Sequence, residues 1–154
     1  MEKSGSLPSV YVGTYEHSLD DKARIILPGA FRQALGKTFI LSAGFDRCLA
    51  LWRRDEWNEF VAREISKRSD LSGEARRLSR WFHASAHLIT VDSQSRFVVP
   101  PPLRSRAALE REVVLTGVGN RVEIWSAKLW RAYSEKTEAT IEEIAESLSQ
   151  DLRV

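Results

Sequence analysis

The hydrophobic pattern of the chain consists of two series of short apolar runs, which follow the same order. In the first series, a run over 11–19 leads through a polar turn to a second run that ends at Pro28. In the second series, a run over 87–91 leads through a turn to a run that ends at Pro100. Short β-branched runs bounded by turn residues predict strands, and the proline suits the first turn of a helix. The predicted strands cover 11–19, 24–27, 38–42, 48–52, 87–91, 96–99, 112–116 and 121–125.

Apolar positions three and four residues apart predict helices in the rest of the chain. Asp55 can cap a helix over 56–68, and a second helix is expected over 74–83. Ser126 can cap a third helix, and the apolar residues of the acidic tail predict a separate helix over 138–148. Helices added to a duplicated β-core make the expected fold class α+β.

The two series are copies of one motif at a nearly constant offset. An internal repeat fixes the architecture before single residues are interpreted, and two copies suit a pseudo-two-fold body with two equivalent surfaces. Trp52 and Trp57 recur 73 positions later as Trp125 and Trp130, and their neighbours mark all of them as core residues. The residues that recur 72 positions later are Asp20, Arg24, Pro28 and Arg32, as Asp92, Arg96, Pro100 and Arg104.

Composition places the chain among ordinary globular proteins, since 154 residues with 43% hydrophobic and 29% charged side chains suit one domain or two intertwined halves. No apolar run approaches the ~20 residues of a membrane span, and no secretory signal opens the sequence. Cys48 is the only cysteine, which excludes an internal disulfide and suits a reducing compartment. We therefore expect a cytoplasmic protein without a membrane partner.

Charge is unevenly distributed along the chain. The formal net charge is +2, but residues 135–154 hold six acidic and two basic side chains, so the remainder carries +6. A basic body suits contact with nucleic acid. The acidic tail, with Ile141, Ile144 and Leu148 at helical spacing, suits either a protein partner or a neighbouring subunit.

The candidate chemistry lies in two turns where an aspartate precedes an arginine by four positions. Asp20 with Arg24, and Asp92 with Arg96, can each form an ion pair across a tight turn. Such a pair can simply hold the turn together, or it can orient the arginine toward a phosphate or a base edge. Spacing does not separate these two roles, because a duplicated fold also duplicates its structural bonds.

Enzyme chemistry finds little support in the sequence. His83 and His87 are four residues apart, but no Cys, Asp or Glu follows at ligand spacing, and the helix is expected to end between them. Cys48 lies in a strand that is expected to be buried, without an adjacent base, and the sequence has no Gly-rich phosphate loop. We expect no enzymatic activity, no cofactor, no metal site and no small-molecule substrate.

Both copies resemble the AbrB-like swapped-hairpin motif, and together they resemble the MraZ family of bacterial transcriptional regulators. The resemblance covers about Tyr11–Tyr133 and rests on YVGTYEHSLDDKARIILPGAFRQALG, CLALW and EW, then on LITVDSQSRFVVPPPLR and EVVLTGVGNRVEIW. It implies one pseudo-symmetric unit per chain and assembly into a closed homo-oligomeric ring. It also implies nucleoid-associated binding of duplex DNA at short G-rich direct repeats, in control of the division and cell-wall gene cluster. The DNA-facing residues that it implies are Asp20, Lys22, Arg24, Asp92, Gln94 and Arg96.

The turns depart from the family pattern, which places glycine before the motif arginine. Ala23 and Ser95 occupy that position here, so the turn is expected either to use right-handed helical geometry or to be repositioned. Gln94 stands in the second copy where the first has Lys22, so the two turns are not expected to bind DNA equally.

The chain divides into five predicted segments. They are a disordered leader (1–10), a first AbrB-like motif (11–57), a helical connector (58–86), a second motif (87–130) and a C-terminal acidic helix (131–154). A rival function is that of an AbrB-like antitoxin module, which grips a protein partner with this acidic tail.

Overall fold

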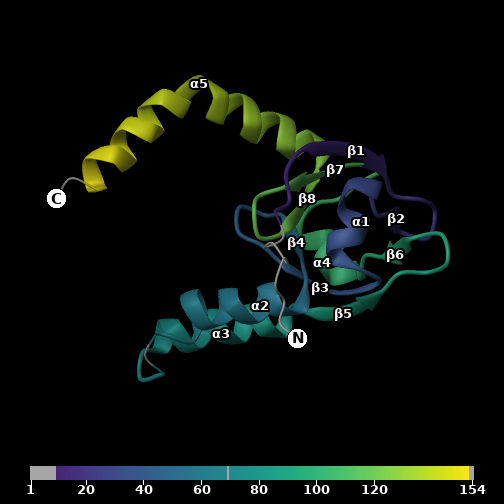
Figure 1. Cartoon of the computed structure of the whole chain (residues 1–154), viewed down its shortest axis with the longest axis horizontal. Coiled ribbons are helices and arrows are strands. Elements are labelled where there is room, and N and C mark those ends of the chain that lie inside the picture. Colours follow the sequence, from purple (N-terminus) through teal and green to yellow (C-terminus); the bar gives the residue numbers. More distant parts are fainter. Residues whose placement is uncertain (1–9, 69, 153–154) are drawn as a thin grey trace, which may run out of the picture.

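The chain folds into an α+β structure, as the sequence predicts, with antiparallel strands and helices (Figure 1). The structure is a computed structural model that describes residues 10–68 and 70–152, so the leader expected over 1–10 lies outside the described residues except for Val10. The strands are β1 (Thr14–Ser18), β2 (Arg24–Ile26), β3 (Thr38–Ala43), β4 (Leu49–Trp52), β5 (His87–Thr90), β6 (Arg96–Val98), β7 (Glu112–Gly117) and β8 (Val122–Ser126). The helices are α1 (Gly29–Leu35), α2 (Arg54–Phe60), the π-helix η1 (Val61–Ile65), α3 (Gly73–Ala84), α4 (Pro101–Arg106) and α5 (Ala127–Leu152).

The two copies of the motif are intertwined through their strands. A six-stranded sheet has the order β1-β7-β8-β4-β3-β5, and β2 pairs with β6 in a separate two-stranded ribbon. The pairs β1–β7, β5–β3, β4–β8 and β2–β6 each join a strand of the first copy to one of the second. Only the hairpins β3–β4 and β7–β8 pair within one copy, so β1, β2, β5 and β6 find their partners solely in the other copy.

Strand register confirms the pseudo-two-fold relation between the copies. In the ribbon, Ile25 lies opposite Phe97, its equivalent 72 positions later. In the centre of the sheet, Ala50 lies opposite Glu123, its equivalent 73 positions later. When a residue pairs with its own equivalent, the two-fold axis must pass between the two. The axis therefore passes through both the ribbon and the centre of the sheet.

The sheet has core on both faces, because alternate residues of a strand point to opposite sides. Leu49 and Leu51 of β4 join the main core, which α1, α4 and the ribbon share, whereas Trp52 points to the other side. There Trp52 packs edge-on against Trp57 with ring centroids 5.9 Å apart. Their equivalents Trp125 and Trp130 pack in the same way at 5.3 Å. The prediction that these tryptophans pack in the core is confirmed for Trp52, Trp57 and Trp125, which are buried, while Trp130 is half-buried.

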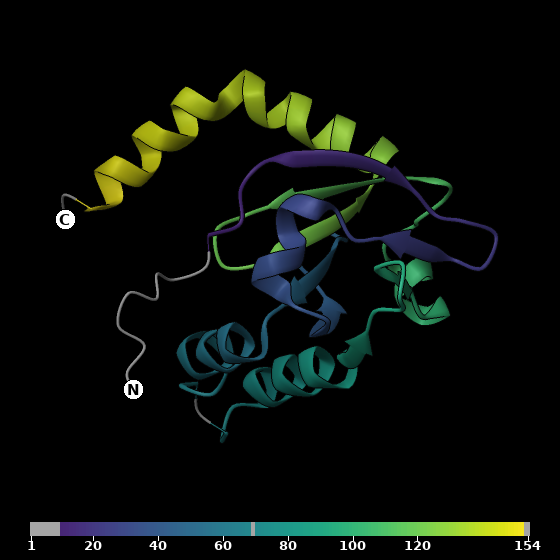
Figure 2. The same cartoon turned by 45° about the vertical axis from the view of Figure 1, so that its right-hand side comes forward.

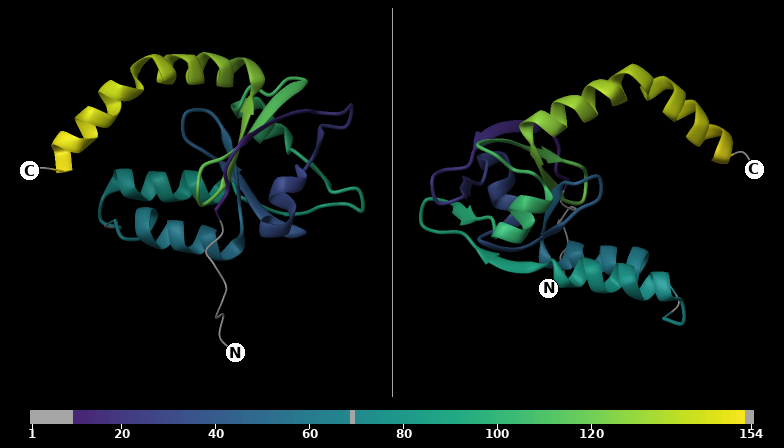
Figure 3. Two further views of the ribbon diagram at one scale, coloured as in Figure 1. Left: turned by 45° about the horizontal axis from the view of Figure 1, so that its top comes forward. Right: turned by 180° about the vertical axis from the view of Figure 1, so that it is seen from behind.

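Each tryptophan pair anchors a helical extension to the sheet. Trp57 of α2 stacks on Phe82 of α3 with ring centroids 4.6 Å apart, so the two helices lie side by side (Figure 2). Trp130 belongs to α5, whose C-terminal part reaches beyond the body (Figure 3). The ribbon lies at the end of the body opposite both extensions (Figure 1). No helix in the described part of the chain is long and apolar enough to cross a membrane.

Two helix predictions are wrong in detail. The first helix begins at Arg54, and Asp55 does not cap it but pairs with Arg53 at 2.7 Å. That helix then widens into the π-helix η1, where Ile65 is buried in the aromatic cluster. The helix capped by Ser126 and the tail helix are one continuous element, α5, because nothing between them breaks the helical hydrogen bonds. Ser126 does cap it, since its hydroxyl accepts a bond from Leu129 N–H at 3.3 Å.

Candidate nucleic-acid interface

The first candidate turn, between β1 and β2, is organised by the carboxylate of Asp20. Its Oδ1 accepts hydrogen bonds from the backbone N–H groups of Lys22 and Arg24, both at 2.9 Å. Its Oδ2 accepts a bond from Arg24 Nε at 2.7 Å. The backbone closes the same turn, because Asp20 N–H donates to the Arg24 carbonyl at 3.0 Å. One side chain thus fixes both the turn and the direction of the arginine.

The second turn, between β5 and β6, repeats this arrangement. Asp92 Oδ1 accepts bonds from the backbone N–H groups of Gln94 and Arg96 at 2.9 Å, and Oδ2 accepts one from Arg96 Nε at 2.9 Å. In both copies the aspartate engages Nε, while fork-like recognition of phosphate or guanine uses the terminal nitrogens of the guanidinium. The bond between the aspartate and Nε therefore holds the turn together and is also compatible with an arginine oriented toward a nucleic acid.

Both turns use left-handed backbone geometry at the position directly before the motif arginine. The φ angle is 58° at Ala23 and 62° at Ser95, so the expectations of right-handed geometry or a repositioned turn are both wrong. The turns are held in place by the opposite copy. Val99 N–H donates to the Ala23 carbonyl at 3.0 Å, and Leu27 N–H donates to the Ser95 carbonyl at 2.9 Å. Surrounding bonds of this kind maintain a backbone conformation that would otherwise relax.

This strain predicts that Ser95→Gly stabilises the protein. The left-handed conformation costs a non-glycine residue about 1–2 kcal/mol, while glycine costs about 0.4–1 kcal/mol through the entropy of the unfolded chain. We expect the free energy of unfolding to rise by about 0.5–1 kcal/mol in urea titrations. Ser93→Gly is the matched control, because Ser93 is outside the positive-φ residues and should only lose stability. A lower stability for Ser95→Gly than for the native chain would contradict the assigned turn geometry.

The ribbon presents an outward face of mixed character next to the turns. Arg24 lies opposite Val98, and Arg96 lies opposite Ile26, so these four side chains share one face. Ile26 and Val98 are 44% and 50% exposed, which is high for apolar residues in a strand. They were not identified as candidate residues from the sequence, although the alternation with buried Ile25 and Phe97 contained the signal.

The local hydrogen bonds hold the pKa of the Asp20 carboxyl down to about 2, mainly through the Arg24 backbone N–H and further through the Arg24 side chain and the Lys22 N–H. The pKa of Asp92 is lowered for the same reasons, with the Arg96 backbone N–H first. A carboxyl pKa depressed by folding adds stability above the unfolded value near 3.9, and this stability is lost as pH falls toward the folded pKa. We expect carboxyl resonances of Asp20 to titrate near pH 2 by NMR. Titration of Asp20 near its ordinary value would show that the turn bonds do not form in solution.

His83, His87 and Cys48 each make a contact with a nearby backbone carbonyl. Near the C-terminal end of α3, His83 Nδ1 lies 2.9 Å from the Ser79 carbonyl. His87, the first residue of β5, places its Nδ1 2.9 Å from the Ser85 carbonyl. Cys48 is fully buried, and burial raises the pKa of its thiol. Across residues 10–68 and 70–152, no group of three or more His, Cys, Asp or Glu side chains is arranged to hold a metal ion.

The similarity to known proteins extends over both copies of the motif. A family model described as "MraZ protein, putative antitoxin-like" matches residues 10–80 and 82–152, one match for each copy. A Caldanaerobacter subterraneus protein named transcriptional regulator MraZ is 41% identical over 137 residues, which cover 89% of this chain and 95% of that protein. A protein of the same name from a Thermoanaerobacter species is 40% identical over 143 residues, covering 93% and 99%. A third, from Syntrophomonas wolfei, is 38% identical over 139 residues, covering 90% and 96%. With both copies matched and relatives aligned along nearly their whole length, the chain belongs to the MraZ family.

Proposed function

We propose that this protein is a sequence-specific DNA-binding transcriptional regulator, which acts in the cytoplasm at the nucleoid. The observation that carries the proposal is the pair of braced Asp–Arg turns at one end of the body, away from the helical extensions (Figures 1 and 3). The names of its relatives, transcriptional regulators, support the same function. The targets we propose are short G-rich direct repeats upstream of the division and cell-wall gene cluster.

The proposed interface residues are Asp20, Lys22, Arg24, Asp92, Gln94 and Arg96. A major groove admits a two-stranded β-ribbon, and arginine is the side chain that most often reads guanine there. In this proposal Arg24 and Arg96 contact base edges or phosphates, and Asp20 and Asp92 hold them in direction. Lys22 adds a charge to the first turn, whereas Gln94 adds only a hydrogen-bonding amide to the second.

We further propose an AbrB-like swapped-hairpin core, with motifs over 11–57 and 87–130, a connector over 58–86 and a C-terminal helix over 131–154. The cross-copy pairs β1–β7, β5–β3 and β2–β6 support such a core. A closed ring of subunits would place several turn pairs along tandem repeats. The resulting avidity needs no strong single contact.

The proposed function is tested by binding to duplex DNA that carries the repeats upstream of the protein's own gene, against scrambled duplex, across a salt series. We expect tight binding that depends on the repeats and whose logarithm falls linearly with the logarithm of the salt concentration. Equal, weak binding to both duplexes would leave only non-specific charge attraction and would remove the proposal.

A second candidate function is an antitoxin-like interaction through the acidic helix. Ile141, Ile144 and Leu148 are 41%, 41% and 59% exposed on the part of α5 that extends beyond the body (Figure 1). A helix in water draws most of its stability from packing an apolar face. Deletion of residues 135–154 separates the possibilities. Loss of assembly with unchanged DNA affinity per subunit would assign the tail to a neighbouring subunit, whereas unchanged assembly and DNA binding would favour a protein partner.

A further inference from the structure

A hollow of about 680 Å³ lies between helix α1 of the first copy and the second turn. Arg32, Gly36 and Lys37 line it from the first copy, and Asp92 and Ser95 line it from the second. The two walls are bonded to each other through the backbone. Val91 N–H donates to the Lys37 carbonyl at 2.9 Å, and Leu27 N–H donates to the Ser95 carbonyl at 2.9 Å. The position of the hollow relative to the turn is therefore set by the fold.

The charges around this hollow favour an anion. Arg32 and Lys37 are both exposed, and Arg32 Nε donates to the Leu27 carbonyl at 2.8 Å, which holds its guanidinium at the hollow. Asp92 is the one acidic lining residue among those described, and its charge is paired with Arg96 at 2.9 Å. The hydroxyls of Ser93 and Ser95 add hydrogen-bond donors. Two cations and two hydroxyls thus surround a space beside the turn.

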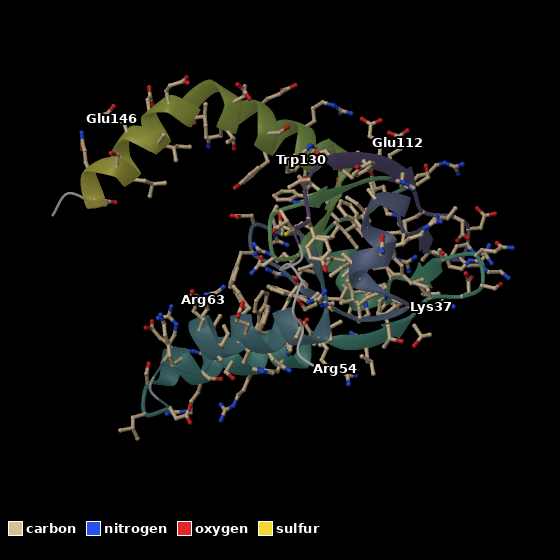
Figure 4. All side chains as sticks on the ribbon, viewed as in Figure 1. Lys37, Arg54, Arg63, Glu112, Trp130 and Glu146 are labelled. Carbon is tan, nitrogen blue, oxygen red and sulfur yellow. The ribbon has the colours of Figure 1, made fainter. Side chains whose placement is uncertain are left out.

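The equivalent position beside the first turn is less positive. Gly36 and Lys37 correspond, 74 positions later, to Glu110 and Arg111, while Arg32 corresponds to Arg104 and Ser93 to Asp21 at an offset of 72. The backbone role is retained there, since Leu19 N–H donates to the Arg111 carbonyl at 2.7 Å, as Val91 N–H does to Lys37. The formal charge of these four residues, however, falls from +2 beside the second turn to 0 beside the first. Figure 4 shows Lys37 and Glu112, the chain neighbour of Arg111, on opposite edges of the β-rich body.

We infer that the hollow beside the second turn is a binding site for a DNA backbone phosphate, held by Lys37 and Arg32. The inference rests on the proposed function and adds to it residues from the first copy that serve the turn of the second. Lysine binds phosphate as a point charge, and arginine binds it through paired N–H groups. The first turn has no such site, because Asp21 and Glu110 offset the charges of Arg104 and Arg111 there.

This site makes the two turns chemically different. The first turn carries Lys22 and Arg24, whereas the second carries Gln94 and Arg96, with Lys37 and Arg32 at its side. Phosphate contacts set register and orientation on the duplex, while base contacts select sequence. The second turn therefore anchors the subunit on the backbone, and the pseudo-symmetric unit binds each repeat in one orientation.

The test compares Lys37→Gln with Arg111→Gln, its pseudo-symmetric match, and with the charge-retaining Lys37→Arg. Binding to repeat-bearing and scrambled duplexes is measured across a salt series, with thermal unfolding to verify folding. For Lys37→Gln we expect the slope of log affinity against log salt to fall in magnitude by about 0.9 per DNA-bound subunit. The native-to-variant affinity ratio should shrink about 3.5-fold per bound subunit between roughly 50 and 200 mM salt. The preference for repeats over scrambled duplex should stay unchanged, because a phosphate carries no sequence information.

Lys37→Arg and Arg111→Gln should both keep the native slope. A native slope in Lys37→Gln, or an equal loss of slope in Lys37→Gln and Arg111→Gln, would overturn the inferred site while leaving the proposed function intact. A native protein that does not distinguish repeat-bearing from scrambled duplex would instead overturn the proposed function and this inference with it.

Discussion

Arg24→Ala is expected to weaken binding to the repeat-bearing duplex by about 1–3 kcal/mol per bound subunit, which is about 5–150-fold. The substitution removes the arginine fork and leaves the Asp20 carboxylate without its 2.7 Å partner. In the proposed complex that carboxylate would face DNA next to Asp21, on the flank where Glu110 precedes Arg111. Lost attraction and added repulsion therefore act together at the first turn.

Arg96→Ala is the comparison, and its effect should be smaller. It also leaves an aspartate unpaired, but Arg32 and Lys37 line the same hollow as Asp92 and offset its charge. Exposed ion pairs stabilise a fold by about 0–1 kcal/mol, so both variants should remain folded. Titration of fluorescent duplex gives the two affinities. Equal binding by both variants and the native chain would remove the turns from the DNA-facing surface.

Gly117→Ala should destabilise the fold by about 3 kcal/mol, through overpacking that the backbone cannot relieve. A Cβ at this position would collide with the backbone of Tyr11 and Val12, not with the end of a flexible side chain. That backbone segment is fixed, because Tyr11 is buried and exchanges two 2.9 Å hydrogen bonds with Gly119. Thermal unfolding should show a decrease in Tm of about 10 °C.

Gly29→Ala provides the matched control for this substitution. A Cβ at Gly29 meets nothing within 4 Å, and the residue begins helix α1. Alanine there should leave the free energy of unfolding unchanged or raise it by about 0.4–1 kcal/mol. A similar loss of stability in both variants would show that any added methyl group is harmful, and that the close approach at Gly117 is not the cause.

Much of the fold was predictable because the same pattern of apolar runs, turns and prolines occurs twice in the sequence. The strand–turn–strand–helix order, the core role of Trp52 and Trp125, and the helix over 74–83 follow from periodicity and turn residues. The partners of the strands were not predictable, because β1–β7 and β5–β3 join residues about a hundred and about fifty positions apart. Hydrophobic periodicity describes which face of a strand is buried, not which strand lies beside it.

The two incorrect helix predictions also have local causes. Asp55 fits the sequence pattern of a cap, yet Arg53 competes for its carboxylate and the helix begins before it. The polar stretch between Tyr133 and Glu138 suggested a break, but polar residues without glycine or proline continue a helix once its ends are supported.

The candidate site was predictable at the turns and not at their flanks. The four-residue spacing of Asp20 and Arg24 already places both on one turn, and the structure confirms the bond for both copies. Lys37, in contrast, lies 55 positions from Asp92 in the sequence and reaches the second turn only because the copies exchange strands. The left-handed φ at Ala23 and Ser95 was missed because it depends on bonds from the opposite copy.

The central claim, that the paired turns read the repeats, is tested most directly by one measurement of discrimination. The ratio of affinities for repeat-bearing and scrambled duplex is compared between Arg24→Ala/Arg96→Ala and Arg77→Ala/Arg80→Ala, which removes the same charge from exposed positions of α3 at the far end of the body. We predict that the turn variant loses its preference for the repeats, while the α3 variant keeps the native preference of about a thousandfold or more. A turn variant that still discriminates, or an α3 variant that loses discrimination equally, would contradict the account.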